Sequence, residues 1–277
     1  MPHNVPHITT FLGTHRYIIL LLLLTVVLCM TFTTFAATDR TVIYYYCAES
    51  TINNFKSLKM EFDRYLSARG SYEFQPFSNR EAFENHIKDK MQCILLLSSW
   101  HYRSIYNDYS LVAVLVGMRN GQKYQKRVLV GKDEITKGGQ IASASSLQHT
   151  SNCLRGMLKE KEVIDKATIL TVPKDIDALL SVGFGISQMA LTTRSALNEL
   201  GLANPSLYQK MKILAEGEES LLLIVAVPER FMKEAKAIVT TIQNMATDPD
   251  GKEKLRMLGL DGWQTLDQSD RLKLEAR

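Results

Sequence analysis

Residues 91–97 read MQCILLL, and this apolar run decides the fold class. A strand that is apolar along its whole length is typical of the centre of a parallel sheet whose two faces are covered by helices. The preceding segments agree, since residues 41–46 and 71–77 have the β-branched and aromatic content of strands. Between them, residues 50–68 carry apolar side chains near helical spacing. This alternation of strand and helix predicts an α/β fold.

The alternation starts again after residue 140. Expected strands are 141–144, 167–172, 186–192 and 220–227, and expected helices are 145–158, 175–181, 229–245 and 251–258. Two α/β lobes account for this order with ordinary loop lengths. We therefore expect a two-lobed fold in which each lobe contains a mainly parallel sheet flanked by helices.

The expected lobes are not continuous in the sequence. Residues 38–113 and 215–277 are assigned to lobe 1 and residues 118–210 to lobe 2, so two crossing segments join the lobes. Arg119-Asn120-Gly121 lies between two apolar segments and predicts a hairpin-like reversal there. Ligands of such folds bind where the carboxyl ends of strands face the N-termini of helices.

Residues 1–37 predict either a signal peptide or an N-terminal membrane anchor. Arg16 precedes an apolar run over residues 17–30, and Thr34 and Ala36 are small residues placed for cleavage near Ala37. Counted through Phe35, the same segment is long enough to span a bilayer. Both interpretations place the rest of the chain in the periplasm or on the outer face of the cytoplasmic membrane.

Composition and motifs exclude several classes of function. A net charge of +4 over 277 residues gives no basic stripe for nucleic acid. The sequence has no nucleophile elbow, zinc-protease motif, P-loop or dinucleotide fingerprint, so we expect neither an enzyme nor a cofactor. The histidines are scattered, which predicts no metal site. Cys47, Cys93 and Cys153 follow the leader without a CxxC pair and leave a disulfide possible but not required.

Three serines stand where an expected strand passes into a helix. The hydroxyls of Ser143, Ser145 and Ser146, together with the free backbone N–H groups of the first helical turn, could all point at one anion. Hydrogen bonds to an ionised ligand are stronger than neutral ones, which suits a phosphate-like group. The alternative is that a serine at this position only caps the helix.

Several short motifs in order resemble a known family. Residues 111–138, the strand and serine-rich helix start at 139–146, residues 185–192, and the segments 248–251 and 258–262 are similar to phosphate/phosphite/phosphonate-type solute-binding proteins of ABC transporters. These are periplasmic binding proteins of a type 2-like fold. The resemblance implies two lobes that close on a small anionic solute, with an ABC permease and its ATPase as partners. The alternative is a membrane-anchored sensing domain or orphan receptor with the same fold.

The resemblance also implies further ligand-binding residues. Ser99, His101 and Tyr102 follow the strand at 91–97, where the family places hydroxyl and aromatic side chains against the ligand, and Tyr102 or His101 takes the position of the family's tyrosine. Glu49, Ser50 and Thr51, after the first strand, form a third rim, of which Ser50 and Thr51 are candidate ligand-binding residues. All of them could instead pack under helices or cap them.

Two positions depart from the family pattern. Gln92 and Gln188 stand where strands of the family usually carry aspartate. An acidic pocket residue can pair with an amino group of a ligand, so its replacement favours a plain oxyanion over a zwitterionic aminophosphonate. Glutamine can still donate a hydrogen bond to oxygen, and we therefore include Gln188 among the candidate ligand-binding residues.

Overall fold

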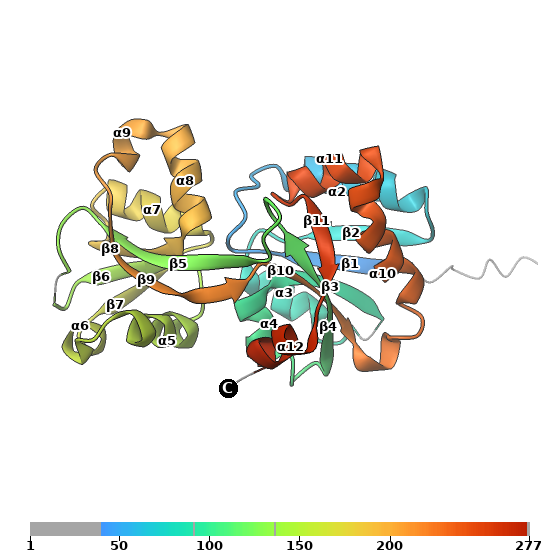
Figure 1. Ribbon diagram of the computed structural model, residues 1–277, viewed down its shortest axis with the longest axis horizontal. Helices are drawn as coiled ribbons and strands as arrows, with labels where there is room; N and C mark the ends of the chain where they lie inside the picture. The colour runs from blue at the N-terminus through green and yellow to red at the C-terminus, as the bar shows by residue number, and fades with distance from the viewer. Residues whose placement is uncertain (1–39, 91, 136, 276–277) are drawn as a thin grey trace, which may run out of the picture. The chain divides into compact units, whose positions relative to one another are not determined.

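The computed structural model of the chain describes residues 40–90, 92–135 and 137–275 (Figure 1). The predicted signal peptide or anchor, residues 1–37, lies outside these residues. Within the described ranges, no helix has both the length and the apolar character needed to cross a membrane.

The first lobe is built on a six-stranded sheet with the strand order β11-β4-β10-β3-β1-β2. Its strands are β1 (Thr41–Tyr46), β2 (Tyr72–Pro76), β3 (Cys93–Ser98), β4 (Leu111–Met118), β10 (Leu223–Pro228) and β11 (Gly262–Thr265). The helices that cover it are α2 (Phe55–Ser67), α3 (Arg80–Ile87), α4 (Ser99–Ile105), α10 (Lys236–Gln243), α11 (Pro249–Met257) and α12 (Gln268–Glu275), with short 3₁₀ turns η1 (Glu229–Phe231) and η2 (Asn244–Thr247).

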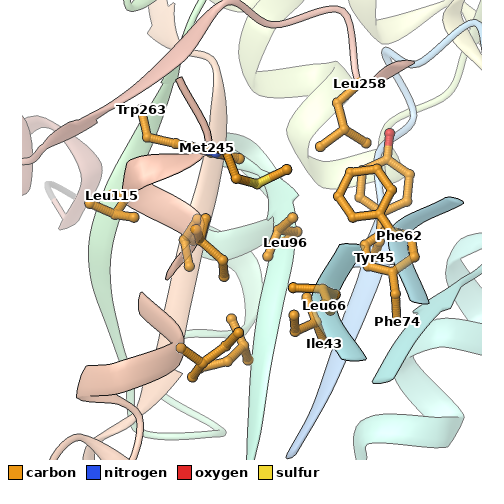
Figure 2. Close-up of a cluster of buried hydrophobic side chains, with 14 of the residues drawn as sticks. Ile43, Tyr45, Phe62, Leu66, Phe74, Leu96, Leu115, Met245, Leu258 and Trp263 are labelled. Atoms are coloured by element: carbon orange, nitrogen blue, oxygen red, sulfur yellow. The ribbon is translucent and has the colours of Figure 1, made fainter. Parts of the chain in front are cut away.

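Strand β3 has the central, fully buried place that its sequence predicts. Ile94 and Leu96 pack with α2, α10 and α11 on one face of the sheet, a core that Figure 2 shows around Phe62 and Phe74. Cys93, Leu95 and Leu97 pack with α3, α4 and α12 on the other face. All six residues of β3 are buried, because both faces of this strand are covered.

The second lobe is built on a five-stranded sheet with the order β7-β6-β8-β5-β9. Its strands are β5 (Tyr124–Gly131), β6 (Gln140–Ser143), β7 (Thr168–Thr171), β8 (Met189–Thr193) and β9 (Lys212–Leu221). One face packs against α7 (Asp175–Gly183) and α8 (Arg194–Ala203), and the other against α5 (Leu147–Met157) and α6 (Lys161–Asp165). The short helix α9 (Pro205–Tyr208) follows α8.

Both sheets are mixed, whereas the sequence predicted mainly parallel ones. In the first lobe β1 pairs in parallel with β2 and β3, but β10 pairs antiparallel with β3 and β4, and β11 antiparallel with β4. In the second lobe β6 is parallel to β7 and β8, while β5 is antiparallel to β8 and β9. The antiparallel pairs involve β4, β5, β9 and β10, the strands that lead into and out of the crossing segments, together with the edge strand β11.

The predicted hairpin at Arg119-Asn120-Gly121 is wrong in one respect. The tight turn exists, with Asn120 at φ 52° and Gly121 at φ 70° and an isolated bridge between Arg119 and Gln122. The flanking strands β4 and β5 nevertheless belong to different sheets. The turn therefore sits in a segment that crosses between the lobes instead of closing a hairpin.

Strand β9 belongs to the second lobe, so the second part of lobe 1 begins later in the sequence than we predicted. Its residues Lys212–Leu221 pair with β5, so residues 215–221, which we assigned to lobe 1, lie in the second sheet. The strand is an edge strand with many exposed charged side chains, and its hydrophobic pattern is correspondingly weak. Leu222 donates its amide to Lys123 O over 2.9 Å, which places the two crossing segments side by side.

Candidate functional site

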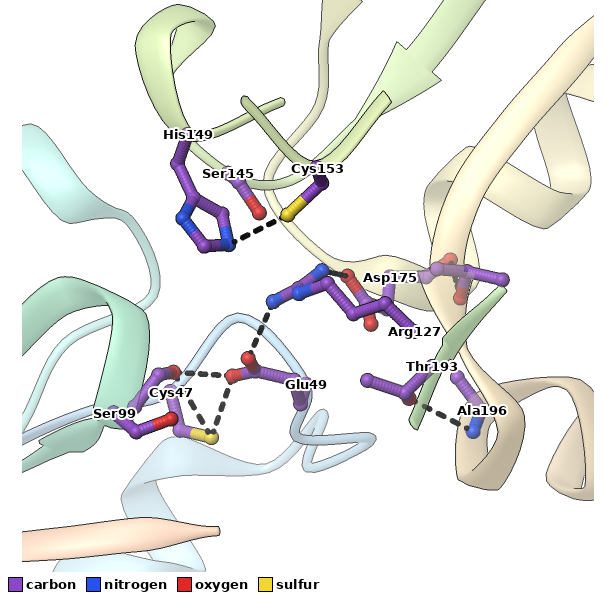
Figure 3. A network of polar contacts seen from close by, with 12 residues as sticks. Cys47, Glu49, Ser99, Arg127, Ser145, His149, Cys153, Asp175, Thr193 and Ala196 are labelled. Carbon is purple, nitrogen blue, oxygen red and sulfur yellow. Dashed lines mark hydrogen bonds and ion pairs between the residues drawn. The ribbon is translucent and has the colours of Figure 1, made fainter. Parts of the chain in front are cut away.

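A buried ion pair joins the two lobes. Glu49 lies in the loop after β1 of the first lobe, and Arg127 lies on β5 of the second. Arg127 Nη2 donates to Glu49 Oε1 over 2.7 Å, and the two side chains are only 5% and 6% exposed (Figure 3). Side chains alternate along a strand, so Arg127 shares the face of Leu129, which is the face that α5 covers.

The Glu49 carboxylate is held from both lobes. In addition to Arg127 of the second lobe, the Ser98 hydroxyl at the end of β3 donates to Oε2. The Cys47 thiol donates to the same oxygen over 3.3 Å. Burial, followed by the nearby Glu49 charge, raises the pKa of Cys47 well above its usual range, which keeps this thiol protonated and able to donate.

Asp175 is the second acid beside the guanidinium. It begins α7 and is 1% exposed, with Oδ1 lying 3.8 Å from Arg127 Nη1. Burial raises the pKa of Asp175 to about 7, the Arg127 charge opposes the rise, and the Glu49 charge adds to it. The backbone amide of Asp175 donates to Ala48 O over 2.9 Å, so the start of α7 also contacts the loop that carries Glu49.

The three serines predicted to hold an anion lie together at the start of α5. Ser146 is the N-cap and accepts the His149 amide over 3.2 Å. The Ser143 hydroxyl accepts from the Ser145 amide over 3.2 Å and from the Thr150 hydroxyl over 2.9 Å. The Ser145 hydroxyl is fully buried and has no hydrogen-bond partner among the described residues. Ser145 is therefore the serine whose hydroxyl remains available.

An aromatic contact between the lobes lies beside this helix start. The Trp100 ring of α4 stacks on the His149 ring of α5, with 5.3 Å between the ring centroids and 26° between their planes. Burial, together with the charges of Arg127 and Arg103, lowers the pKa of His149 to about 3. The imidazole is therefore neutral at physiological pH. Its Nε2 lies 3.3 Å from Cys153 Sγ.

A cavity of about 690 Å³ reaches Arg127 from the side of these rings. Its walls come from α4 of the first lobe, α5 and β9 of the second, and α12, and they include Trp100, Arg103, Arg127, Ser146 and His149. This volume is in the range of small-molecule sites in proteins. The cavity therefore offers a route and a space for a small solute next to a buried cationic side chain.

The predicted residues on α4 are engaged in other contacts. The Ser99 hydroxyl donates to Leu221 O over 2.6 Å, and His101 Nε2 lies 2.9 Å from Glu84 Oε1. The Tyr102 hydroxyl donates to Leu111 O over 3.1 Å and accepts the Ala113 amide over 3.3 Å. All three side chains are buried, so their polar atoms connect α4 to neighbouring strands and to α3.

The remaining predicted residues make local hydrogen bonds or are exposed. Ser50 Oγ accepts the Ile52 amide over 3.2 Å, and Thr51 is exposed in the same loop. Gln188 is exposed, and its Oε1 accepts the Gln140 amide over 2.6 Å. Gln92 is exposed before β3. The acids near Arg127 are Glu49 and Asp175, which stand at positions other than Gln92 and Gln188.

Sequence reasoning missed Arg127 and Asp175 as site residues. The sequence did contain a signal that Arg127 is buried and paired. Arg127 directly precedes the apolar run 128–130, and an arginine beside buried positions needs a partner. Asp175 looked like an ordinary acid in the first turn of a helix, which is favourable for the helix dipole alone. No local pattern pairs either residue with Glu49, which is 78 positions away from Arg127.

Comparison with known proteins finds similarity only at the level of structure. A scan against protein-family models finds no match, and a search of curated proteins finds no significant relative. Similar solved structures include XAC2383 from Xanthomonas citri bound to ATP, with a TM-score of 0.69, 12% identity, and coverage of 86% of this chain and 95% of that one.

Two other similar structures are a protein in complex with methylphosphonate and a component of a phosphonate transporter. PhnD1 from Prochlorococcus marinus, in complex with methylphosphonate, has a TM-score of 0.67 at 13% identity and covers 85% of this chain and 96% of its own. The binding protein component of a phosphonate ABC transporter from Pseudomonas aeruginosa has a TM-score of 0.65 at 11% identity, with 85% of each chain covered. Together with the two mixed sheets, these similarities show that the chain has the two-lobed α/β fold of periplasmic binding proteins.

Proposed function

We propose that this chain is an extracytoplasmic solute-binding protein that holds a small oxyanion between its lobes and delivers it to an ABC transporter. The observation that carries the proposal is that the buried Arg127 and the N-cap of α5, Ser146, both line a cavity of about 690 Å³. Next to this N-cap, the Ser145 hydroxyl has no hydrogen-bond partner among the described residues. Resemblance of the sequence motifs and of the fold to phosphonate-binding proteins supports the same class of solute.

The electrostatics of the α5 start favour an anion. Burial lowers the pKa of His149, and the Arg127 and Arg103 charges act in the same direction. Burial raises the pKa of Cys153, and the same two charges oppose that rise, so both side chains feel the positive potential of these arginines. The N-terminus of α5 adds the partial positive charge of its unpaired backbone N–H groups. Because the region is buried, these interactions are screened less than they would be at the surface.

The available donors are sufficient for tight binding only if they act together. Micromolar affinity corresponds to about 8 kcal/mol, whereas a helix N-terminus contributes up to about 2 kcal/mol. Each hydrogen bond to a charged group adds about 1.5–3 kcal/mol. Arg127 and Ser145 therefore have to bind the same oxyanion for the site to be effective.

A thermal-shift screen of the full chain in detergent tests the function. We expect methylphosphonate, phosphate or a related oxyanion to raise the melting temperature, since a ligand that binds only the folded state stabilises it by about 2.7 kcal/mol at one hundred times its dissociation constant. Arg127→Gln should remove the shift. A flat response to phosphate, methylphosphonate, sulfate and small carboxylates would argue against the proposal.

The proposal also includes export and a membrane partner. The apolar run at residues 17–30 would act as a signal peptide or as an anchor that keeps the chain at the outer face of the cytoplasmic membrane. Mass spectrometry of the protein from its own cell distinguishes these cases: an N-terminus near Ala37 indicates cleavage, and an intact Met1 in the membrane fraction indicates an anchor. Co-purification with an ABC permease tests the transport role against that of a free-standing receptor.

A further inference from the structure

The donors that hold the Glu49 carboxylate form a complete anion receptor. Arg127 Nη2 at 2.7 Å comes from the second lobe, and the Ser98 hydroxyl and the Cys47 thiol come from the first. All of them converge on a carboxylate that is 6% exposed. A small oxyanion held between the lobes would need this same combination of a cation and neutral donors.

Arg127 is the one cationic group that this network offers to its acids among the described residues. Glu49 takes Nη2, and Asp175 lies 3.8 Å from Nη1. Arg127 also lines the cavity, so an incoming solute reaches the guanidinium that Glu49 already contacts. An anionic solute on this guanidinium would face the Glu49 carboxylate at close range, and like charges that are this near repel strongly in a buried site.

We propose that Glu49 is an internal competitor of the solute: an anionic solute binds by replacing the Glu49 carboxylate on Arg127. This inference rests on the proposed solute-binding function and adds a residue that sets its affinity. On the guanidinium itself one oxyanion replaces another, and the displaced Glu49 carboxylate keeps the Ser98 hydroxyl and the Cys47 thiol as donors. Arg127 is never left buried without a partner, which would be strongly unfavourable. The competition selects solutes that bind Arg127 better than a tethered carboxylate does.

Hydrogen exchange at the start of α7, which contacts the loop that carries Glu49, tests the Glu49–Arg127 pair without any solute. The Asp175 amide donates to Ala48 O over 2.9 Å, and the Lys174 ammonium donates to Asn53 Oδ1 over 3.0 Å. If the Glu49–Arg127 pair holds this loop against the second lobe, its removal should speed hydrogen exchange at residues 172–176. The sheets of both lobes should keep their protection.

Glu49→Gln is the decisive variant, because it keeps the shape of the side chain and removes its charge. We expect it to bind methylphosphonate or acetate at least tenfold more tightly than the wild type in calorimetric titrations of the full chain. Glu49→Asp retains the charge on a shorter side chain and should show a smaller gain. Glu216→Gln is the matched control, since it removes the exposed ion pair with Arg194 in the second lobe and should change nothing.

The outcomes separate this inference from the proposed function. Tighter anion binding by Glu49→Gln, together with faster exchange at residues 172–176, supports the competition. Equal affinities of wild type and Glu49→Gln overturn it and leave the solute-binding function standing. Failure of the wild type and both Glu49 variants to bind any tested anion overturns both. Unchanged exchange in Glu49→Gln contradicts a role of the pair in holding the lobes, even if the protein binds anions.

Discussion

The backbone amide of Asp175 donates a 2.9 Å hydrogen bond to the carbonyl oxygen of Ala48, which ties the start of α7 in one lobe to the loop after β1 in the other. Lys174, the residue before Asp175, contacts Asn53 in the same loop. The Tyr46 hydroxyl lies 3.5 Å from Pro173 O. One short segment of the second lobe therefore makes much of the contact near the Glu49–Arg127 pair. The charges placed at this contact lead to specific predictions.

Asp175→Asn should change how stability depends on pH. The pKa of Asp175 is about 7 in the folded protein and about 3.9 in an unfolded chain, so between these values the folded state binds more protons. The stability of the wild type relative to the variant must therefore fall as pH rises from 4 to 7. Urea unfolding of both proteins at several pH values measures the difference. A pH-independent difference would show that Asp175 titrates normally.

His149→Gln should give the opposite trend. Folding lowers the pKa of His149 from about 6.5 to about 3, so the unfolded state binds more protons between these values. The wild type should lose stability relative to the variant as pH falls from 7 to 4. Chemical denaturation across this range checks the sign. If the wild type gained stability on the acidic side, the histidine would be charged in the folded protein.

Ser145→Ala and Ser143→Ala should differ sharply. The Ser145 hydroxyl has no partner among the described residues, so its removal should leave stability almost unchanged and weaken oxyanion binding about tenfold or more. Ser143 accepts two hydrogen bonds, and its removal should cost about 1–3 kcal/mol of stability. Thermal unfolding and titration of the two variants separate these roles. Equal affinity in Ser145→Ala would remove this serine from the site.

Tyr102→Phe should affect folding and not binding. Its hydroxyl joins Leu111 O to the Ala113 amide inside the first lobe, and the variant leaves both groups with one hydrogen bond fewer. We expect a loss of about 1–3 kcal/mol of unfolding free energy with an unchanged oxyanion affinity. Weaker binding at full stability would instead support the role that the family resemblance implies for this tyrosine.

The sequence predicts the strands well where burial on both faces of a sheet requires apolar or β-branched side chains. The apolar run before Ser98 and the β-branched strand Thr41–Tyr46 are both strands in the first sheet, because burial on two faces demands such residues. Strand β9 and the turn at Asn120-Gly121 were misjudged. An exposed charged edge strand has no apolar signature, and a tight turn does not reveal whether its strands pair or diverge.

The site was predictable only in part. Ser146 caps α5 as its position before an amphipathic helix suggests, and Ser143 and Ser145 lie beside it. The Glu49–Arg127 pair arises from two lobes whose relative placement depends on the whole chain, and no local spacing encodes it. Likewise, the hydroxyl of Tyr102 points to partners on β4 that the order of residues on α4 does not indicate.

Crystals of the protein grown with selenate test the central claim most directly, because selenium marks an oxyanion by its anomalous scattering. We predict a peak within hydrogen-bonding distance of both Arg127 and the Ser145 hydroxyl, with the Glu49 carboxylate displaced from the guanidinium. A peak confined to exposed lysines, with Glu49 still bound to Arg127, would contradict the account of this protein as an oxyanion-binding receptor.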